Sequence, residues 1–590
     1  MVLVDKQPGS SRSGFIVSKE LPIFFVMMKF NVKVALIFML CIGIFTILTL
    51  YSFCGSTEKE WNKFYIANSK SIDIPVSEEI DCDINGEYII GCRKEGDDVY
   101  VPFSFLHRYF EVYGKLATYD GIERFEWTHS YGKVYHPKGK YDPRGVFMYF
   151  DNYNVEVRER VKCVSASEGV PVSIQWESQG YYYPTQIAQF GLSHFSKNLT
   201  EPEPRRKTVE DCEKDLAKWI VPTTAQLERV FDKSLNTRTL TFSTSDNYMD
   251  GIKLKMDHVL YFVMSLDILL TNNSSLCITL QNRESKEIHY LHYITSDIWI
   301  TAQDNNIYHG IGTVKEWNKI TRDLIVDLHK GLVYSEKDKS KLKISRSKIK
   351  IVEVTLRGSG RLDNFTLSSS EHIQQFYDAA EWFVRHQNVE TGGWAINVKR
   401  KLASGFRDLE PGWYSAMSQG HALSVLSRAY YHSGGDIRYL TAALRGLKPF
   451  RVSSSKGGVR ATFLNKYFWY EEYPTRPASF VLNGFIYSLL GLYDLITIAP
   501  PGQAQEAEFL YNEGMISLKN MLTLFDMGSV TSYDLRHFTI GIEPNLARWD
   551  YHATHINQLL LLSTIENEPL YKITAERWIG YMNGKRADHN

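Results

Sequence analysis

The sequence lacks the short motifs that mark the commonest cofactor-dependent and hydrolytic enzymes. It contains no glycine-rich nucleotide fingerprint, no P-loop, no HExxH metal motif and no GxSxG nucleophile elbow in a usable context. No pair among its 7 cysteines has the spacing of a zinc site. Lys+Arg and Asp+Glu are equal at 67 each, which argues against a generally basic nucleic-acid binder but permits a local basic cleft.

The chain is long and rich in aromatic residues. Its 590 residues are enough for two or three domains, each with its own core. Aromatic residues make up 13% of it, including 36 tyrosines and 12 tryptophans. Sugar-binding proteins are often rich in aromatic rings, because the C–H faces of pyranoses stack on them, but large β-rich domains bury such rings as well. Composition alone leaves both interpretations open.

An uncharged apolar run at residues 34–53 is long enough to span a bilayer. Basic residues precede it at positions 6, 12, 19, 29 and 33. The positive-inside rule therefore predicts a cytosolic tail over residues 1–33 and a single-pass type II signal-anchor over residues 34–53, with the rest of the chain in a lumen or outside the cell. A cleaved signal peptide is the alternative, but the run is too long and begins too late for one. The polar residues 54–80 are predicted to be a stem.

Potential N-glycosylation sites agree with this orientation. The acceptor asparagines are Asn198, Asn272, Asn273 and Asn364. Nearer the stem, Cys82 and Cys92 flank an Asn85-Gly86 pair, which indicates a tight hairpin turn. A disulfide bridge between these two cysteines fits that turn.

Alternating apolar residues predict an N-terminal β-hairpin region over residues 81–200. Its predicted strands include residues 98–105, 145–150 and 154–161. Residues 175–186 differ, since a glycine followed by three tyrosines and a proline is typical of a loop that exposes rings and amides together. This loop has two equally supported interpretations: it is a hydrophobic clamp between domains, or it is a sugar subsite.

A second β-rich block predicts a β-sandwich domain over residues 201–369. Its predicted strands include residues 259–264, 276–280 and 288–293, and residues 349–356 close the series. The basic stretch 337–350 is interpreted as a solvated edge or loop, in preference to a polyanion-binding segment.

At Ser370 the hydrophobic period changes from that of strands to that of helices. Helices are predicted at residues 416–431, 438–447, 478–495, 504–524, 556–565 and 570–582. Helix pairs joined by Gly/Pro-rich loops are typical of a toroid of α-hairpins, whose loops ring a central cleft. Residues 370–590 are therefore predicted to form a helical catalytic domain.

Three polar clusters lie in loops of this domain, at residues 469–477, 533–537 and 545–552. Tyrosine is a poor base at its usual pKa of about 10. Arg536 and Arg548 would lower that pKa and would also bind a substrate carboxylate. A base of this kind beside carboxylate-binding arginines suits a reaction that removes a proton α to a carboxylate, as at C5 of a uronic acid. Return of a proton on the opposite face gives epimerisation, and loss of the C4 substituent gives lyase cleavage. The same residue types also serve as ordinary packing and hydrogen-bonding groups.

Segments 409–420, 469–495, 533–538 and 545–565 closely resemble the D-glucuronyl C5-epimerase family of heparan sulfate and heparin biosynthesis. The resemblance implies a multidomain α and β fold, with an N-terminal β-hairpin region, a β-sandwich-like domain and a C-terminal (α/α) barrel, assembled as a homodimer. It also implies a Golgi enzyme with a lumenal catalytic domain. Such an enzyme converts D-glucuronate to L-iduronate within N-sulfated heparosan, with no redox or nucleotide cofactor and no nucleic-acid partner.

Matching motifs carry the family's site residues onto this chain. The resemblance implies a catalytic group of Glu472, Tyr473 and Tyr551, with Tyr551 and the Glu472/Tyr473 pair on opposite faces of C5. The implied substrate-binding residues are Lys401, Leu402, Ala403, Ser404, Asn483, Tyr533, Arg536, Asn545, Arg548, Trp549, His552, Thr554, Phe147, Met148 and Trp176. The alternatives are a uronate-directed polysaccharide lyase and a non-catalytic receptor for sulfated glycans on the same toroid.

The resemblance further implies a structural calcium ion held by carboxylates near the sandwich. Asp232 and Asp363 match best, and hard oxygen ligands fit calcium. Residues 207–210 depart from the family's pattern where another acidic ligand is expected.

Overall fold

The computed structural model describes residues 77–84, 86–109, 112–119, 121–129, 132–213, 218–245, 251–271, 273–313, 316–335 and 345–588. The predicted cytosolic tail and signal-anchor, most of the stem, Asn272 and much of the basic stretch 337–350 lie outside these residues. Among the residues described, no helix is both long and apolar enough to cross a bilayer. The chain divides into two compact units, Met1–Trp127 and Thr128–Asn590.

The first unit is built from hairpins. In it, β1 (Glu78–Ile84), β2 (Tyr88–Glu95) and β3 (Asp98–Tyr100) form one sheet, and β4 (Val112–Tyr119) pairs with β5 (Ile122–His129). The predicted disulfide between Cys82 and Cys92 is confirmed and links β1 to β2. The strand predicted at residues 98–105 is wrong in its second half, where α2 (Phe103–Tyr109) begins directly after Pro102. Pro102 has no N–H to give to a strand ladder and so ends the sheet.

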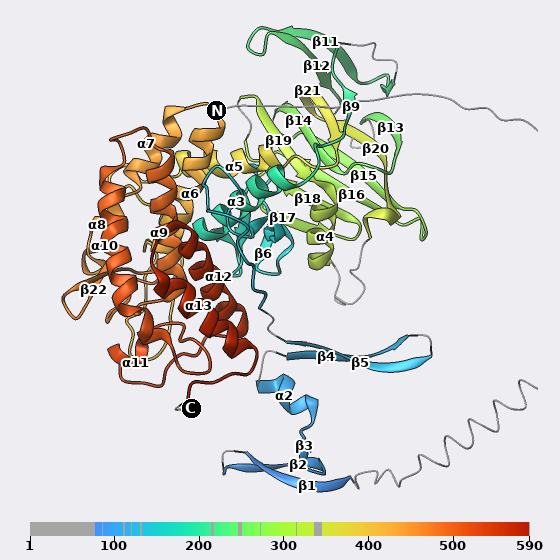
Figure 1. Cartoon of the computed structure of the whole chain (residues 1–590). Coiled ribbons are helices and arrows are strands. Elements are labelled where there is room, and N and C mark those ends of the chain that lie inside the picture. The colour runs from blue at the N-terminus through green and yellow to red at the C-terminus, as the bar shows by residue number, and fades with distance from the viewer. Residues whose placement is uncertain are drawn as a thin grey trace, which may run out of the picture. The chain divides into compact units, whose positions relative to one another are not determined.

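A β-sandwich occupies one part of the second unit (Figure 1). One sheet has the order β10-β13-β20-β15-β16-β18-β17, and the other has the order β11-β12-β21-β14-β19, with β9 paired to β21. The strands are β9 (Arg206–Glu210), β10 (Trp219–Ile220), β11 (Gln226–Asp232), β12 (Thr237–Ser243), β13 (Ile252–His258), β14 (Val263–Leu270), β15 (Ser275–Asn282), β16 (Ile288–Ile294), β17 (Ile300–Gln303), β18 (Asn306–Gly310), β19 (Asn318–Asp323), β20 (Ile349–Arg357) and β21 (Ser359–Ser368).

The inward-facing side chains of both sheets make one apolar core, to which Leu240, Leu266, Ile278 and Leu356 all belong. Strands predicted at residues 276–280, 288–293 and 349–356 are confirmed. The strand predicted at residues 259–264 is mostly wrong, because a turn separates β13 from β14. In that turn the imidazole Nε2 of His258 accepts a hydrogen bond from the Tyr261 N–H. The series ends with β21 rather than β20.

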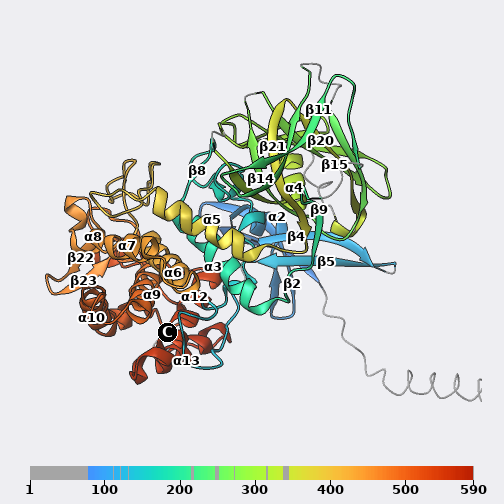
Figure 2. The ribbon, with the colours of Figure 1, turned by 90° about the horizontal axis from the view of Figure 1, so that it is seen from above.

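Helices form the other part of the second unit, and Figures 1 and 2 show them stacked side by side. They are α3 (Pro184–Thr200), α4 (Leu324–Ser335), which flanks the sandwich, α5 (His372–Arg385), α6 (Ala416–His432), α7 (Ile437–Arg445), α8 (Lys448–Arg451), α9 (Leu482–Ile498), α10 (Gln505–Met521), α11 (Arg536–Thr539), α12 (Trp549–Ile565) and α13 (Pro569–Met582). All six helices predicted after Ser370 are present. The hairpin of β22 (Arg460–Phe463) and β23 (Tyr467–Tyr470) leads into α9.

Two helix boundaries differ from the prediction in ways that matter for the site. The helix predicted from residue 478 begins at Leu482, because the positive φ of 55° at Phe480 is incompatible with a right-handed helix there. The helix predicted from residue 556 begins at Trp549. As a result, Tyr551 lies in the first turn of α12 rather than in a loop.

The strands predicted at residues 145–150 and 154–161 are wrong except at Val161, where β6 begins. They form short 3₁₀ turns at Phe150–Asn152 and Val155–Val157 before β6 (Val161–Val164), which pairs with β7 (Pro171–Ser173) and, through it, β8 (Tyr181–Tyr182). The apolar side chains here are buried against helices instead of across a sheet. Residues 184–200, which were expected among hairpins, form α3 and pack on α5 and α6.

Candidate active site

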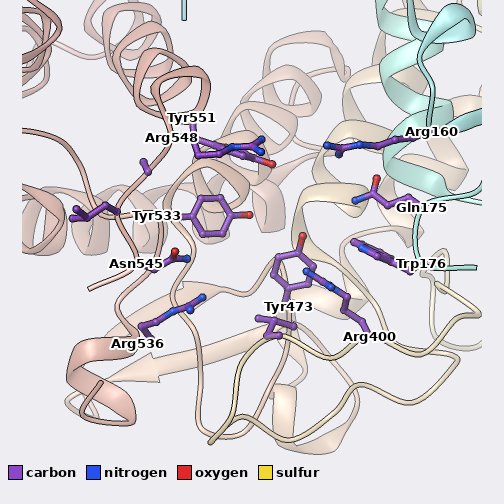
Figure 3. Close-up of a pocket in the computed structure, with 13 residues that line it drawn as sticks. Arg160, Gln175, Trp176, Arg400, Tyr473, Tyr533, Arg536, Asn545, Arg548 and Tyr551 are labelled. Carbon is purple, nitrogen blue, oxygen red and sulfur yellow. The ribbon is translucent and has the colours of Figure 1, made fainter. Parts of the chain in front are cut away.

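A polar cleft lies where loops of the helical part meet the segment that precedes α3. Its first cavity has a volume of about 450 Å³, and a second cavity of about 540 Å³ adjoins it. Both cavities are lined by Arg160, Gln175, Tyr473 and Tyr551, so they are parts of one cleft. Figure 3 shows the hydroxyl groups of Tyr473, Tyr533 and Tyr551 pointing into the first cavity.

Backbone hydrogen bonds hold the three predicted clusters together. The Leu482 N–H at the start of α9 donates to the Tyr533 carbonyl at 3.1 Å, and the Tyr533 N–H donates to the Asn545 carbonyl at 2.7 Å. The Leu535 N–H donates to the Ser479 carbonyl at 3.0 Å. The segments at residues 469–477, 533–537 and 545–552 therefore form one site, as the sequence predicted.

Glu471 fixes the loop between β23 and α9. Its fully buried carboxylate accepts hydrogen bonds from the Ser479 hydroxyl at 2.8 Å and from the Phe480 N–H at 3.0 Å. Burial raises the pKa of Glu471 to about 8, against the hydrogen bonds from Ser479 and Phe480, which lower it. Because all these partners lie inside the loop, Glu471 positions Glu472 and Tyr473 and does not face the cleft.

Glu472 is the buried acid among the residues that line the cleft. Its side chain is 4% exposed, and its Oε2 has no hydrogen-bond partner within the described chain. Burial raises the pKa of Glu472 to about 7, although hydrogen bonding from Tyr473 and the charge of Arg400 lower it. A carboxyl group that titrates near neutral pH can accept a proton in one step and return it in another.

Gly484, on α9, makes room for this carboxylate. A Cβ atom at this position would lie 2.3 Å from Oε2 of Glu472 and 2.6 Å from its Cβ. We therefore expect Gly484→Ala to displace Glu472 and to lower turnover by about 10²-fold, the size of a misplaced proton-transfer group. Steady-state kinetics with circular dichroism would check this. Gly139→Ala is the control, since a Cβ there would meet no atom within 4 Å and the residue lines neither catalytic cavity. Equal turnover in both variants would contradict the expectation.

The tyrosines of the cleft are held in their protonated form, which corrects one expectation. Burial raises the pKa of Tyr473, of Tyr533 and of Tyr551, and the nearby Glu472 carboxylate raises each of them further. Arg548 lies 5.3 Å from the Tyr551 ring centre and does lower the pKa of Tyr551, but burial outweighs it. Arg536 is engaged elsewhere, because its guanidinium donates to both oxygens of Asp534. In the free protein these phenols are proton donors rather than phenolate bases.

Cationic and aromatic groups complete the walls. Arg400 lies 4.7 Å from the Trp176 ring centre and 5.7 Å from that of Tyr473, and its buried Nε has no hydrogen-bond partner in the described structure. Trp176 has a φ of 76°, which is unusual for a bulky residue and directs its ring toward the cleft (Figure 3). The loop at residues 175–186 thus lines the cleft and also packs through Tyr181 in a small apolar cluster.

Comparison with known proteins identifies the family. Family models described as "D-glucuronyl C5-epimerase C-terminus" and "D-glucuronyl C5-epimerase, beta-sandwich domain" match residues 387–580 and 236–359. The D-glucuronyl C5-epimerase of Caenorhabditis elegans is 36% identical over 567 residues, covering 88% of this chain and 90% of that protein. The chain belongs to the D-glucuronyl C5-epimerase family.

Other similarities are more partial. An uncharacterized protein of Methanocaldococcus jannaschii is 32% identical over 198 residues, which are 33% of this chain and 59% of that protein. A solved family 11 carbohydrate-binding module of Clostridium thermocellum covers 28% of this chain and 95% of its own, at 14% identity and a TM-score of 0.19. That score is too low to support any argument.

The structure brings most of the residues implied by the C5-epimerase family into the cleft. Those that line it are Glu472, Tyr473, Tyr551, Trp176, Leu402, Asn483, Tyr533, Arg536, Asn545, Arg548 and Thr554. Lys401, Ala403 and Ser404 adjoin Leu402 but do not line either cavity.

Four residues implied by the family lie elsewhere in the structure. Phe147 is fully buried and packs edge-on against Phe150, so it belongs to the core. His552 is also fully buried, and its ring nitrogens contact Thr531 and the Trp578 carbonyl. Met148 lines a separate cavity, and Trp549 lines a cavity that adjoins the first at residues 546–548. The helical path of each segment decides these positions, because neighbouring residues on a helix or turn point in different directions.

Sequence reasoning missed several residues that line the cleft. These are Tyr153, Arg158, Glu159, Arg160, Gln189, Arg400, Met417 and Tyr487, and Gln175, Tyr183, Thr185 and Gln186 lay in a loop with two interpretations. Arg158, Glu159 and Arg160 lie in the stretch 154–161, where a strand was predicted. The closely spaced charges Arg158, Glu159 and Arg160 were the available signal, since such a run fits a buried strand poorly.

The two carboxylates implied for calcium do not fit one ion. Asp232 ends β11 and Asp363 lies in β21, with β12 between them, so their strands are about 10 Å apart. Asp232 is already paired with Arg361 at 2.9 Å, whereas Asp363 is buried and has no such cationic partner in the described chain. Burial and the charges of Asp267 and Glu213 raise the pKa of Asp363. Asp232 therefore already has a charged partner, whereas Asp363 has none among the described residues. The described residues contain no group of three or more His, Cys, Asp or Glu side chains in metal-binding geometry.

Proposed function

We propose that this protein converts D-glucuronate to L-iduronate at C5 within N-sulfated heparosan, in heparan sulfate and heparin biosynthesis. The observation that carries this proposal is the pairing of a buried carboxyl group with a pKa of about 7 and buried, protonated tyrosines in one arginine-lined cleft. The reaction class is that of an isomerase acting on a carbohydrate, which agrees with membership of the family.

The arginines address the main difficulty of the reaction, the weak acidity of the C5 hydrogen. When the C5–H bond breaks, its electron pair moves into the carboxylate, which becomes a dianionic enolate. Arg160 and Arg400 line the cleft together with Arg548 and would neutralise this growing charge. Preorganised cations contribute most where charge develops in the transition state.

Glu472 and Tyr551 supply the proton transfers. Glu472, with Tyr473 beside it, takes the C5 proton on one face, and the Tyr551 hydroxyl gives a proton to C5 on the other. The Glu472 carboxyl then carries one proton more and Tyr551 one fewer, and exchange through the neighbouring tyrosines and solvent restores both. The reverse reaction uses the same groups in opposite order, and this assignment leaves open which group acts as base in which direction.

Hydrogen exchange at C5 tests this function. N-sulfated heparosan incubated with the enzyme in heavy water is expected to gain deuterium at C5, with iduronate appearing and no chain scission. Ultraviolet absorbance from a 4,5-unsaturated uronate would instead indicate a lyase. Salt-sensitive binding without exchange at any enzyme concentration would indicate a glycan receptor.

We extend the proposal to the protein's setting. The apolar run at residues 34–53 supports a single-pass type II anchor with a lumenal catalytic domain, which we place in the Golgi membrane. Family membership supports a homodimer and a helical part closed into an (α/α) barrel. Sedimentation of the lumenal part at several concentrations would test the dimer.

Calcium binding is proposed at Asp363 as a structural feature only. Because a cation would relieve the repulsion among Asp363, Asp267 and Glu213, we expect removal of calcium by a chelator to lower the melting temperature by several degrees. Calcium should restore it. In Asp363→Asn this response should disappear, and in Asp232→Asn, the matched control, it should persist. A melting temperature that changes neither with the chelator nor with added calcium would refute the proposal.

A further inference from the structure

A third cavity adjoins the catalytic cleft, and we call it the outer cavity. It has a volume of about 380 Å³ and is lined by Ser529, Val530, Leu546, Ala547, Arg548, Trp549, Tyr581, Gly584, Lys585 and Arg586. Three of these residues, Leu546, Ala547 and Arg548, also line the first catalytic cavity. This short segment is therefore a shared wall. A polymer that leaves the catalytic cavity across the wall enters the outer cavity.

The outer cavity combines an aromatic surface with unpaired cations. Trp549 is 38% exposed although it begins a helix that is otherwise largely buried. Lys585 and Arg586 are exposed and make no ion pair within the described residues. An indole face suits the C–H face of a pyranose, and ammonium and guanidinium groups suit sulfate or carboxylate.

The path of the chain after α13 places Lys585 and Arg586 in the outer cavity. After α13 the chain reverses at Gly584, which has a φ of 81°, and the Lys585 N–H donates to the Gly580 carbonyl at 3.0 Å. The Ala587 N–H donates to the Gly528 carbonyl at 2.8 Å. The tail is thus tied at both ends to the walls of the cavity. The Lys585 stem packs against Gly580, where the absence of a side chain gives it room.

Neighbouring acids do not cancel these charges. Asp526 is paired with Arg577 at 2.7 Å and accepts hydrogen bonds from Trp578 and Tyr581. Asp550 is paired with Arg548 at 3.0 Å. Asp588 follows on the same tail but does not line the cavity, so Lys585 and Arg586 are the charged groups on this side of it.

We propose that the outer cavity binds an acidic saccharide unit of the polymer outside the reacting uronate. Its pyranose ring lies on Trp549, and its sulfate or carboxylate group is bound by Lys585 and Arg586. The identity of the polymer rests on the proposed function, whereas the binding of an anionic saccharide chain does not. The site adds affinity for long chains without taking part in proton transfer.

The test compares Lys585→Ala/Arg586→Ala with Lys456→Ala/Lys466→Ala, which removes two exposed lysines from the β22–β23 region. For long N-sulfated heparosan at low salt, the first variant should show a KM and a calorimetric Kd raised about tenfold, with kcat changed less than twofold. The second should match the wild type. The difference should shrink sharply in 0.5 M salt, because salt screens exposed charges. For oligosaccharides too short to cross the shared wall, all three proteins should behave alike.

The outcomes separate this inference from the proposed function. Unchanged KM and Kd for long chains in Lys585→Ala/Arg586→Ala, and also in the charge reversal Lys585→Glu/Arg586→Glu, would overturn the outer site while leaving the epimerase intact. An equal loss of kcat on short and long substrates would also overturn it. If the wild type fails to exchange hydrogen on every substrate, the proposed function fails, and the calorimetric comparison with long chains still decides whether the outer cavity binds them.

Discussion

Glu472→Gln is expected to lower the rate of C5 hydrogen exchange by about 10³-fold, within the range for loss of a general acid–base group. The substitution keeps the size of the side chain and removes the only function that the geometry assigns to it, carrying a proton. Deuterium incorporation measured by mass spectrometry would give the rate, and binding of the polymer should stay within a few-fold of the wild type. Exchange at near-normal rates in a well-folded Glu472→Gln protein would remove Glu472 from the mechanism.

The pH dependence of the wild type provides a second measure of the same residue. Burial raises the pKa of Glu472 to about 7, so the fraction able to accept a proton grows as pH rises toward and beyond 7. We expect kcat/KM in the direction that uses Glu472 as base to rise over this range and then level off. The small residual kcat/KM of Glu472→Gln should not rise with pH over this range.

Stability should change with pH in the opposite sense. As pH rises past the ordinary glutamate range, the unfolded chain releases this proton, while the folded protein keeps it until about pH 7. Folding stability therefore falls across this window, by roughly 3 kcal/mol from this one group. Glu472→Gln lacks this penalty, so relative to the wild type it should be more stable at pH 8 than at pH 4. Thermal melts of both proteins at the two pH values would show it, and identical shifts would contradict the burial assigned to Glu472.

Tyr551→Phe and Tyr473→Phe are each expected to lower epimerisation by about 10²- to 10³-fold while preserving polymer binding. Each substitution removes one hydroxyl and leaves the ring that packs in the cleft. The control is Tyr571→Phe, a buried tyrosine of α13 that lines neither catalytic cavity and should retain turnover. Measured rates of iduronate formation and calorimetric affinities would separate loss of chemistry from loss of binding.

The Tyr551 variant also tests the arrangement on two faces. If Glu472 abstracts the C5 proton and Tyr551 serves the other face, Tyr551→Phe should still exchange hydrogen from one epimer with retention of configuration. Inversion should be lost more severely than exchange. Parallel loss of exchange and inversion from both epimers would place the two groups on the same face, and near-normal turnover in both tyrosine variants would remove the assignment altogether.

Local chemistry made much of the fold predictable. Asn85-Gly86 between two cysteines indicated a hairpin and its disulfide, and the period change at Ser370 indicated the helices that follow it. Pro477 marked the loop that carries Glu472 because proline cannot continue a helix or a strand. The prediction failed between residues 145 and 161, where apolar alternation reflects burial among helices, and Phe147 and Phe150 pack beside His421 and Tyr487. Periodicity reports which side chains are buried but not what buries them.

The sequence by itself determined the family, the order of hairpins, sandwich and helices, and the three segments that meet at the site. It also singled out Glu472, Tyr473 and Tyr551, because their motifs are long and specific. Only the tertiary structure decided that Arg160, Gln175 and Arg400 join them, since these residues lie up to 312 positions away from Glu472 along the chain. Only burial decided the protonation states. Nearby arginines lower the pKa of a tyrosine, but burial raises the pKa of Tyr551 by more than Arg548 lowers it. Burial also raises the pKa of Glu472 to about 7.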